Sequence, residues 1–69
     1  MKAKTMSKKE LAMLYFMNST PENASIQLQR WIDHNILLKE ELIRAGYHKG
    51  QHLFTPLQVS LIYQYLGEP

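Results

Sequence analysis

Four polar side chains lie at spacings of three and four residues, so that they would form one row along a helix. They are Asn23, Gln27, Arg30 and His34. Asn and Gln side chains can bond adenine edges, and Arg can bond guanine or a phosphate group. The row is therefore a candidate DNA-binding surface. It is also what an ordinary solvated face looks like, because every surface helix needs a polar side.

The charges around this row favour DNA binding only in part. The formal net charge is +2, and four of the eight basic residues lie between Lys2 and Lys9. A polyanion would meet a basic arm attached to a mildly acidic body, which is compatible with DNA binding without requiring it. Glu22 and Asp33 flank the row and would repel phosphate groups, while Ile26 near the same face hints at a contact surface. The candidate phosphate contacts are the lysines of the arm from Lys2 to Lys9, which include Lys8 and Lys9, together with Lys49. If the loop around Lys49 is a wing, His48 and His52 could touch the phosphate backbone as well.

Other chemistry finds little support. His48 and His52 are four residues apart, but Gly50 lies between them and no thiol or carboxylate is near. We therefore expect ordinary loop histidines and no metal site. There is no nucleophile–base pair in a recognisable motif and no glycine-rich phosphate loop. We expect no enzyme activity, no cofactor and no small-molecule substrate.

Length and composition indicate one small domain. The 69 residues include no cysteine, so no disulfide can stabilise the fold. A chain this short buries only about 60% of its unfolded surface, which makes a homodimer a plausible way to bury more. No apolar run approaches the roughly 18 residues of a membrane span. No signal peptide is recognisable either, and we expect a cytoplasmic protein with no membrane partner.

A helix-start signature occurs near each end of the chain. A hydroxyl residue is followed three positions later by Glu or Gln, so that the two residues can satisfy each other's backbone N–H groups. The pairs are Ser7 with Glu10 and Thr55 with Gln58. We expect residues 1–6 to form a flexible basic arm and residues 7–67 a single helical domain.

The remaining spacing predicts four helices, with a turn before the second. Thr20 gains as a cap from Pro21 after it, and Ser19 gains from Glu22, so the cap of the second helix stays open between them. Gly46 is a natural helix stop. The expected helices cover 7–16, a stretch from Ser19 or Thr20 to 34, 36–45, and 55–67. The expected core positions are Leu11, Leu14, Tyr15, Ala24, Leu28, Trp31, Ile32, Leu38, Leu42 and Ala45.

Two local contacts are also expected. Glu40 and Arg44 lie one helical turn apart and can pair weakly. Residues 47–54 are not helix-like. Lys49-Gly50 could turn a short hairpin there, with Tyr47 and Phe54 on its two sides.

The fourth helix is apolar on two sides. One face carries Val59, Ile62, Tyr63 and Leu66, and the other carries Leu57, Leu61 and Tyr65. A helix that is apolar on both sides must be buried on both sides. The second face could meet the third helix or a second copy of the chain. It is the interface of a rival hypothesis, in which the chain is a protein-interaction module.

Several segments resemble known families. Residues 7–16, with Glu10-Leu11-Ala12, are similar to the first helix of excisionase-type and MerR-type winged helix-turn-helix domains. Arg30-Trp31-Ile32 resembles the end of their recognition helix. Gly46-Tyr47 and Phe54-Thr55-Pro56 resemble the wing and the helix after it. Residues 36–45 would be an extra helix in that pattern.

The whole chain resembles a family of short uncharacterised proteins common in Bacteroides-type gut bacteria. The recurring features are a Glu-Leu-Ala start, a Ser-Thr-Pro turn, Arg-Trp-Ile, Gly-Tyr and a Leu-Gly-Glu-Pro end. The resemblance implies a mostly all-α, four-helix, winged helix-turn-helix-like domain with a hairpin wing at 47–54. The leading hypothesis is a DNA-binding transcription or mobile-element accessory factor, and the alternative is the interaction module.

Overall fold

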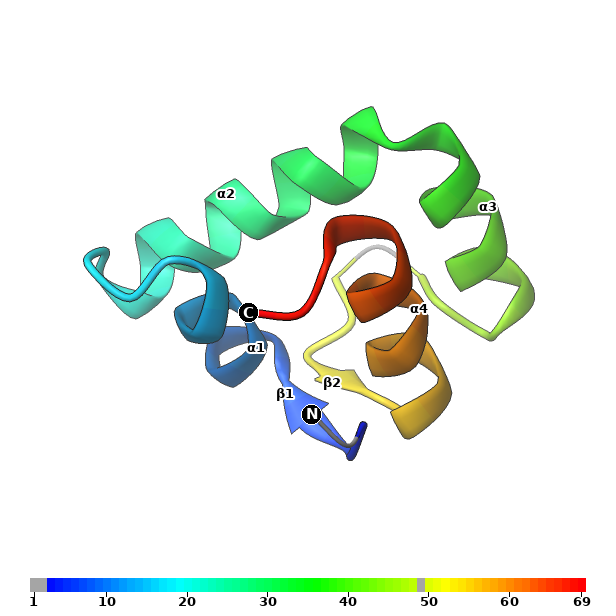
Figure 1. The fold of residues 1–69 in the computed structure, drawn as a ribbon, viewed down its shortest axis with the longest axis horizontal. Helices are drawn as coiled ribbons and strands as arrows, with labels where there is room; N and C mark the ends of the chain where they lie inside the picture. The colour runs from blue at the N-terminus through cyan, green and yellow to red at the C-terminus, as the bar shows by residue number, and fades with distance from the viewer. Residues whose placement is uncertain (1–2, 49) are drawn as a thin grey trace.

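The computed structural model describes residues 3–48 and 50–69 of the chain. These residues form four helices and a two-stranded sheet, as the spacing predicted for the helices. In Figure 1, α2 and α3 form an arch above α1, the strands and α4. The elements in order are β1 Met6–Ser7, α1 Lys8–Tyr15, α2 Pro21–His34, α3 Ile36–Arg44, β2 Leu53–Phe54 and α4 Pro56–Leu66.

Side chains close the helix starts as the sequence predicted. Ser7 Oγ accepts from the Glu10 N–H at 3.1 Å, and Glu10 Oε1 accepts from the Ser7 N–H at 3.2 Å. Thr55 and Gln58 form the same reciprocal pair at 3.2 and 3.0 Å. At α2, Thr20 is the cap, with its Oγ1 accepting from Asn23 N–H at 3.3 Å. This hydrogen bond identifies Thr20, and not Ser19, as the N-cap of α2.

Asn35 joins α2 and α3 through both its backbone and its side chain. Its N–H donates to the carbonyls of Trp31 and Ile32, which ends α2. Its Oδ1 accepts from the Leu38 N–H at 3.0 Å, which begins α3. One residue therefore turns the chain between two helices and holds α3 at an angle to α2 (Figure 1). At the other end of α3, Gly46 has a φ of 91°, which confirms the predicted stop.

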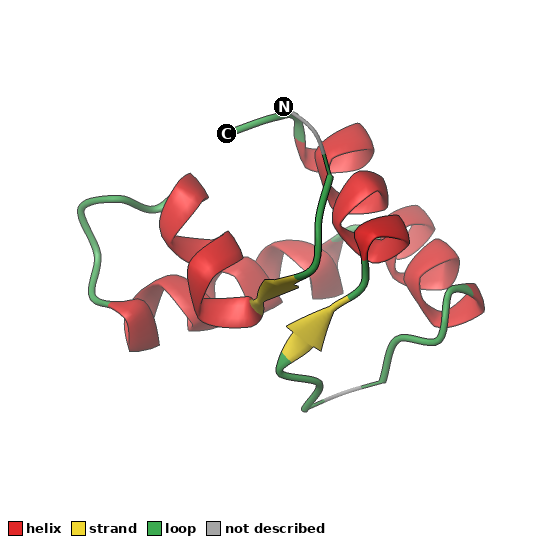
Figure 2. Cartoon of the chain, turned by 90° about the horizontal axis from the view of Figure 1, so that it is seen from below, coloured by secondary structure: helices red, strands yellow, loops and turns green. Residues whose placement is uncertain are grey.

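The strand pairing differs from the expected hairpin. β1 and β2 are antiparallel, with Met6 opposite Phe54 and Ser7 opposite Leu53. The Lys8 N–H extends the pairing by donating to the His52 carbonyl at 2.7 Å. Figure 2 shows the two strands side by side, with β1 running directly into α1 and β2 joined to α4 by a short connection.

The hairpin predicted within 47–54 is therefore wrong, because β2 pairs with the N-terminal segment. The sequence places Met6 in the basic arm, but it is only 5% exposed, and Phe54 is fully buried. Pairing these two residues buries both apolar side chains, which a turn at Lys49-Gly50 would not do. Lys49 itself lies outside the described residues.

The core draws on all six elements. It contains Met6, Leu11, Ala12, Ala24, Leu28, Ile32, Leu38, Leu42, Tyr47, Phe54, Val59, Ile62 and Tyr63. Trp31, expected in the core, is 44% exposed. Its ring lies at the edge of the core, edge-on to Phe16 with centroids 4.7 Å apart and to Tyr15 at 6.1 Å. Ala45 is half-buried at the end of α3.

One predicted ion pair has a different partner. Arg44 Nη1 lies 3.3 Å from Glu41 Oε1 instead of pairing with Glu40. Both spacings bring side chains together on a helix, and Glu41 is the more buried of the two glutamates. The pair is solvent-exposed on the arginine side, so it contributes little to stability.

The buried Gln58 ties α4 to the segment that follows α3. Its Nε2 donates to the Ala45 carbonyl at 3.2 Å, while its Oε1 accepts from Gln51 Nε2 and from the Thr55 N–H. It is 1% exposed, and these bonds satisfy its amide. The sequence predicted only its capping role, because the other partners are distant in the chain. Among the described residues, no helix is long and apolar enough to cross a membrane.

Candidate functional site

Helix α2 is held by one face and leaves the opposite face to solvent. Ala24, Leu28 and Ile32 are fully buried and fix its rotation about its axis. An α-helix turns by about 100° per residue, so that Ile26 and Arg30 lie within about 20° of the direction opposite this buried stripe. Both side chains are exposed. They are the most outward-pointing positions of the helix.

Three members of the predicted polar row lie on this outer face. Asn23, Arg30 and His34 are exposed, and their side chains make no hydrogen bond or ion pair with residues 3–48 or 50–69. Gln27 is half-buried, and its Nε2 donates to Ser19 Oγ at 3.0 Å. The structure thus leaves Asn23, Arg30 and His34 as available hydrogen-bonding groups, with Gln27 at the inner edge of the row.

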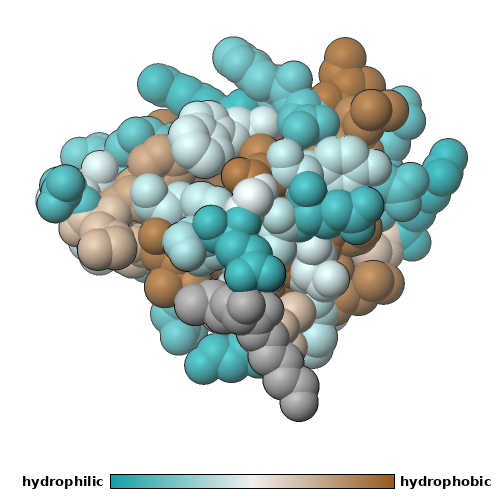
Figure 3. Space-filling model, in the orientation of Figure 1, coloured by the Kyte–Doolittle hydropathy of each residue, from teal (hydrophilic) through white to brown (hydrophobic). Residues whose placement is uncertain are grey.

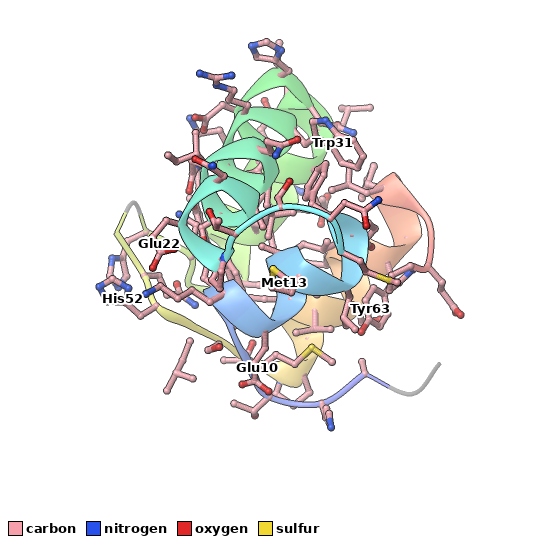
Figure 4. The ribbon with its side chains drawn as sticks, turned by 90° about the vertical axis from the view of Figure 1, so that its left-hand side faces the viewer. Glu10, Met13, Glu22, Trp31, His52 and Tyr63 are labelled. Atoms are coloured by element: carbon pink, nitrogen blue, oxygen red, sulfur yellow. The ribbon has the colours of Figure 1, made fainter. Side chains whose placement is uncertain are left out.

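The carboxylates that flank the row are paired with lysines. Glu22 Oε1 lies 3.8 Å from Lys9 Nζ, and Asp33 Oδ1 lies 3.2 Å from Lys39 Nζ. Figure 4 shows Glu22 and Trp31 on opposite flanks of α2. The acidic residues therefore border the outer face on one side, and lysines partly neutralise them.

A polar cluster connects that same flank to the rest of the fold. Gln29 Oε1 accepts from Lys8 Nζ at 2.7 Å and from the Tyr47 hydroxyl at 3.1 Å, and Gln29 Nε2 donates to Asp33 at 3.1 Å. Burial lowers the pKa of the Lys8 ammonium, and the charge of Asp33 opposes this shift. Lys8, a predicted phosphate contact, thus points into the protein toward Gln29. Beside this cluster is a pocket of about 330 Å³, lined by Gln29, Asp33, Lys39, Ile43, Tyr47 and His48.

The predicted interface on α4 is only partly available. Leu57 is 60% exposed, whereas Leu61 and Tyr65 are half-buried and pack against the core. Of the predicted phosphate contacts among the described residues, Lys4 and Lys9 are exposed, whereas Lys8 is bonded to Gln29.

Two adjacent, strongly exposed apolar residues lie instead where α2 meets α3. Figure 3 shows apolar atoms gathered at this corner, at the upper right. Ile36 is 69% exposed and Leu37 is 64% exposed. A groove of about 500 Å³ lies beside them, lined by Trp31, His34, Asn35, Ile36, Leu37 and Leu66. The sequence did contain a signal, because the consecutive apolar residues at 36–38 cannot all face one side of a helix.

A tyrosine fixes the C-terminal end of α4 to α1. The Tyr15 hydroxyl donates to the Gly67 carbonyl. Burial raises the pKa of Tyr15 to about 12, and Tyr63 and Glu68 add to the shift. Burial also raises the pKa of Tyr63. These groups are structural and do not line either pocket.

The histidines of the loop do not form a metal centre within the described residues. His48 and His52 are exposed, and no group of three His, Cys, Asp or Glu residues in 3–48 and 50–69 is arranged to hold a metal ion. His52 contributes its backbone carbonyl to the pairing with Lys8.

Comparison with known proteins identifies the family. The sequence matches the domain of unknown function DUF4248 over residues 2–69, and the chain belongs to this family. Neither a curated protein nor a solved structure matches it.

Proposed function

We propose that this chain binds duplex DNA through the outer face of α2, as a small transcription or mobile-element accessory factor of helix-turn-helix type. The observation that carries the proposal is the position of Arg30. Its exposed guanidinium lies at one of the two most outward positions of α2 and has no partner among the described residues. Arg at such a position can bond guanine edges or phosphates.

The neighbours of Arg30 support the same role. Asn23 lies on the same face, seven residues earlier, and supplies an amide that can bond adenine. His34, one turn after Arg30, supplies ring nitrogens that can donate or accept a hydrogen bond. Glu22 and Asp33 would oppose a polyanion, but each is paired with a lysine. The local charge balance therefore permits approach to phosphates.

The dimensions of α2 fit a major groove. A helix of 14 residues is about 21 Å long, and a major groove about 12 Å wide admits one α-helix. α1 packs across α2, with a short connection between them (Figure 1). In the proposed mode α2 is the recognition helix, and α1 lies behind it.

Phosphate contacts come from the N-terminal segment in this proposal. Lys4 is exposed, and Lys9 is held only by a long, solvent-exposed ion pair. An exposed pair of this kind is worth at most about 1 kcal/mol, so a phosphate can replace Glu22. Lys8 is not part of the surface, because it is bonded to Gln29.

The test is fluorescence anisotropy with random-sequence duplex DNA at two salt concentrations. If three phosphates are neutralised, a fourfold rise in salt weakens binding by roughly 40-fold. Absence of binding at low salt would reject the proposal, and so would binding that salt does not change.

A second candidate function rests on a different observation, the apolar groove beside Trp31. In this alternative the chain is an interaction module whose partner is a second copy of itself. Ile36 and Leu37 line the groove, so a two-fold arrangement can bring the grooves of two copies face to face and bury this pair from each copy against the other. The interface is then the corner between α2 and α3, and not the α4 face of Leu57, Leu61 and Tyr65.

Light scattering decides between these alternatives. The dimer predicts twice the mass of the chain for the parent protein, and the mass of one chain for Leu37→Glu. Leu57→Glu is the matched control, because Leu57 has a similar exposure of 60% on α4. A monomeric parent removes this candidate, and a dimer disrupted by Leu57→Glu alone returns the interface to α4.

A further inference from the structure

Ile26 is an apolar residue at the centre of a polar surface. Its side chain is 52% exposed, and it shares the most outward direction of α2 with Arg30. Asn23 precedes it by three residues and Arg30 follows it by four, so both are its neighbours on the helix surface. The other exposed apolar residues of α2 and α3 do not share this position, because Trp31, Ile36 and Leu37 line the groove at the corner and Ile43 lines the pocket beside Gln29.

We propose that Ile26 reads thymine, by contacting the 5-methyl group that thymine displays in the major groove. The inference rests on the proposed DNA binding and adds a base preference to it. The thymine methyl is the apolar group on the floor of the major groove, and apolar side chains are its usual contacts. A β-branched side chain flanked by an amide and a guanidinium would touch the methyl while its neighbours bond adjacent base edges.

The hydrogen-bonding groups beside Ile26 favour this ligand over an apolar protein surface. Arg30 and Asn23 beside Ile26 have no partner among the described residues, and burial against an apolar surface would leave them without hydrogen bonds. Base edges and phosphates offer acceptors for both. The same docked helix therefore satisfies one apolar and two polar side chains together.

The experiment removes the methyl group and nothing else. Sequences that bind the parent protein are first selected from a random duplex pool. The selected pool is then amplified twice, once with thymidine triphosphate and once with deoxyuridine triphosphate, and both products are titrated. Burying one methyl group contributes about 0.8 kcal/mol, so we expect the parent to bind the uracil pool about fourfold more weakly.

Two variants assign the effect to Ile26. Ile26→Ser should bind both pools equally, because the side chain that contacts the methyl is gone. Ile43→Ser is the matched control, since Ile43 has a similar exposure of 56% but lies on α3. It should keep the parent's preference for thymine. Circular dichroism checks that each variant retains its helices.

The outcomes separate this inference from the function on which it rests. Equal affinity of the parent for the two pools overturns the role of Ile26 while leaving DNA binding intact. A uracil penalty that persists in Ile26→Ser also overturns it, because the penalty then comes from another residue or from DNA shape. If the parent binds no DNA at low salt, the proposed function fails and this inference fails with it.

Discussion

The two polar sides of α2 differ in what their side chains contact. On one side Gln29 and Asp33 bond to Lys8, Tyr47 and Lys39 within the protein. On the outer face, the side chains of Asn23, Arg30 and His34 have no partner among the described residues. Both sides are polar in sequence, so polarity alone does not distinguish a structural contact from an available one.

The difference comes from the direction in which the chain turns after α2. Asn35 turns the chain into α3, which places Lys39 beside Asp33. The segment after α3 then brings Tyr47 to Gln29. Among the described residues, no later element covers the outer face around Ile26 and Arg30, and the polar groups of that face remain in solvent. The polar side chains of this outer face therefore remain available to bind a partner.

The largest expected effect is on the outer face. Arg30→Ala should weaken DNA binding by about 5- to 150-fold at low salt, because a well-placed Arg contact is worth about 1–3 kcal/mol. The thermal stability should stay unchanged, since Arg30 has no partner among the described residues. Anisotropy and thermal unfolding measure the two quantities.

Arg44→Ala is the control for that prediction. Arg44 is also exposed, but it lies on α3 beside Glu41. Its loss should leave DNA affinity within about twofold, as expected for a residue outside the contact surface. Equal losses for the two arginines would mean that only net charge matters, and that α2 has no special role.

The next largest effect is expected on the side of α2 that carries Gln29 and Asp33, and it concerns the stability of the fold. Gln29→Ala should lower the free energy of unfolding by about 1–3 kcal/mol, because Lys8 and Tyr47 both lose their acceptor in a part-buried site. DNA affinity of the folded protein should change little. Chemical denaturation and anisotropy again measure the two quantities.

Gln27→Ala makes the comparison within one residue type. Gln27 is also half-buried on α2, but its side chain has one bond, to Ser19. We expect a stability loss of about 0.5–1.5 kcal/mol, which is the usual contribution of one hydrogen bond. A larger stability loss for Gln27→Ala than for Gln29→Ala would contradict the assignment of the two sides.

The local features of this fold were predictable from sequence, because their partners are close in the chain. The pairs Ser7 with Glu10 and Thr55 with Gln58 are three residues apart, and both capping boxes are present. The stop at Gly46 depends on one residue that tolerates a positive φ. Such signals need no knowledge of the tertiary structure.

The long-range contacts were not predictable in the same way. Met6 pairs with Phe54 from the other end of the chain, and no local pattern indicates that register. Trp31 fits the periodicity of a core residue, yet it lies at the rim beside Phe16. Lys8 is the residue type expected for a phosphate contact, but its ammonium donates a hydrogen bond to Gln29 Oε1. In each case a distant residue decides the environment.

A smaller effect should arise at the acidic border of the outer face. Glu22→Gln should strengthen DNA binding about two- to threefold at low salt, because it removes a carboxylate that repels phosphates and releases Lys9. Loss of a negative charge in the first turn of α2 should lower stability by no more than about 1 kcal/mol. Glu40→Gln, on the exposed side of α3, is the matched control for anisotropy titrations. Weaker binding by Glu22→Gln would place the contact surface elsewhere.

The smallest effect concerns Tyr15. Its ring lies edge-on to Trp31 on a flank of α2, and its hydroxyl donates to the Gly67 carbonyl. Its pKa of about 12 in the folded chain lies above that of an unfolded tyrosine, about 10. Between about pH 10 and pH 12 the unfolded chain loses the Tyr15 proton while the folded chain keeps it. The contribution of Tyr15 to the free energy of unfolding is therefore fully present below about pH 10 and is lost as the pH rises toward 12.

Tyr15→Phe should make that alkaline loss of stability smaller and remove one late step from the tyrosinate absorbance titration. Some loss should persist, because burial also raises the pKa of Tyr63. Tyr65→Phe should retain the late step of Tyr15. DNA affinity at neutral pH should be the same for Tyr15→Phe and the parent, since the hydroxyl is already bonded within the chain. If Tyr15→Phe weakened DNA binding at neutral pH, a bonded polar group would be part of the contact surface, and the distinction between the two sides of α2 would no longer predict which residues bind.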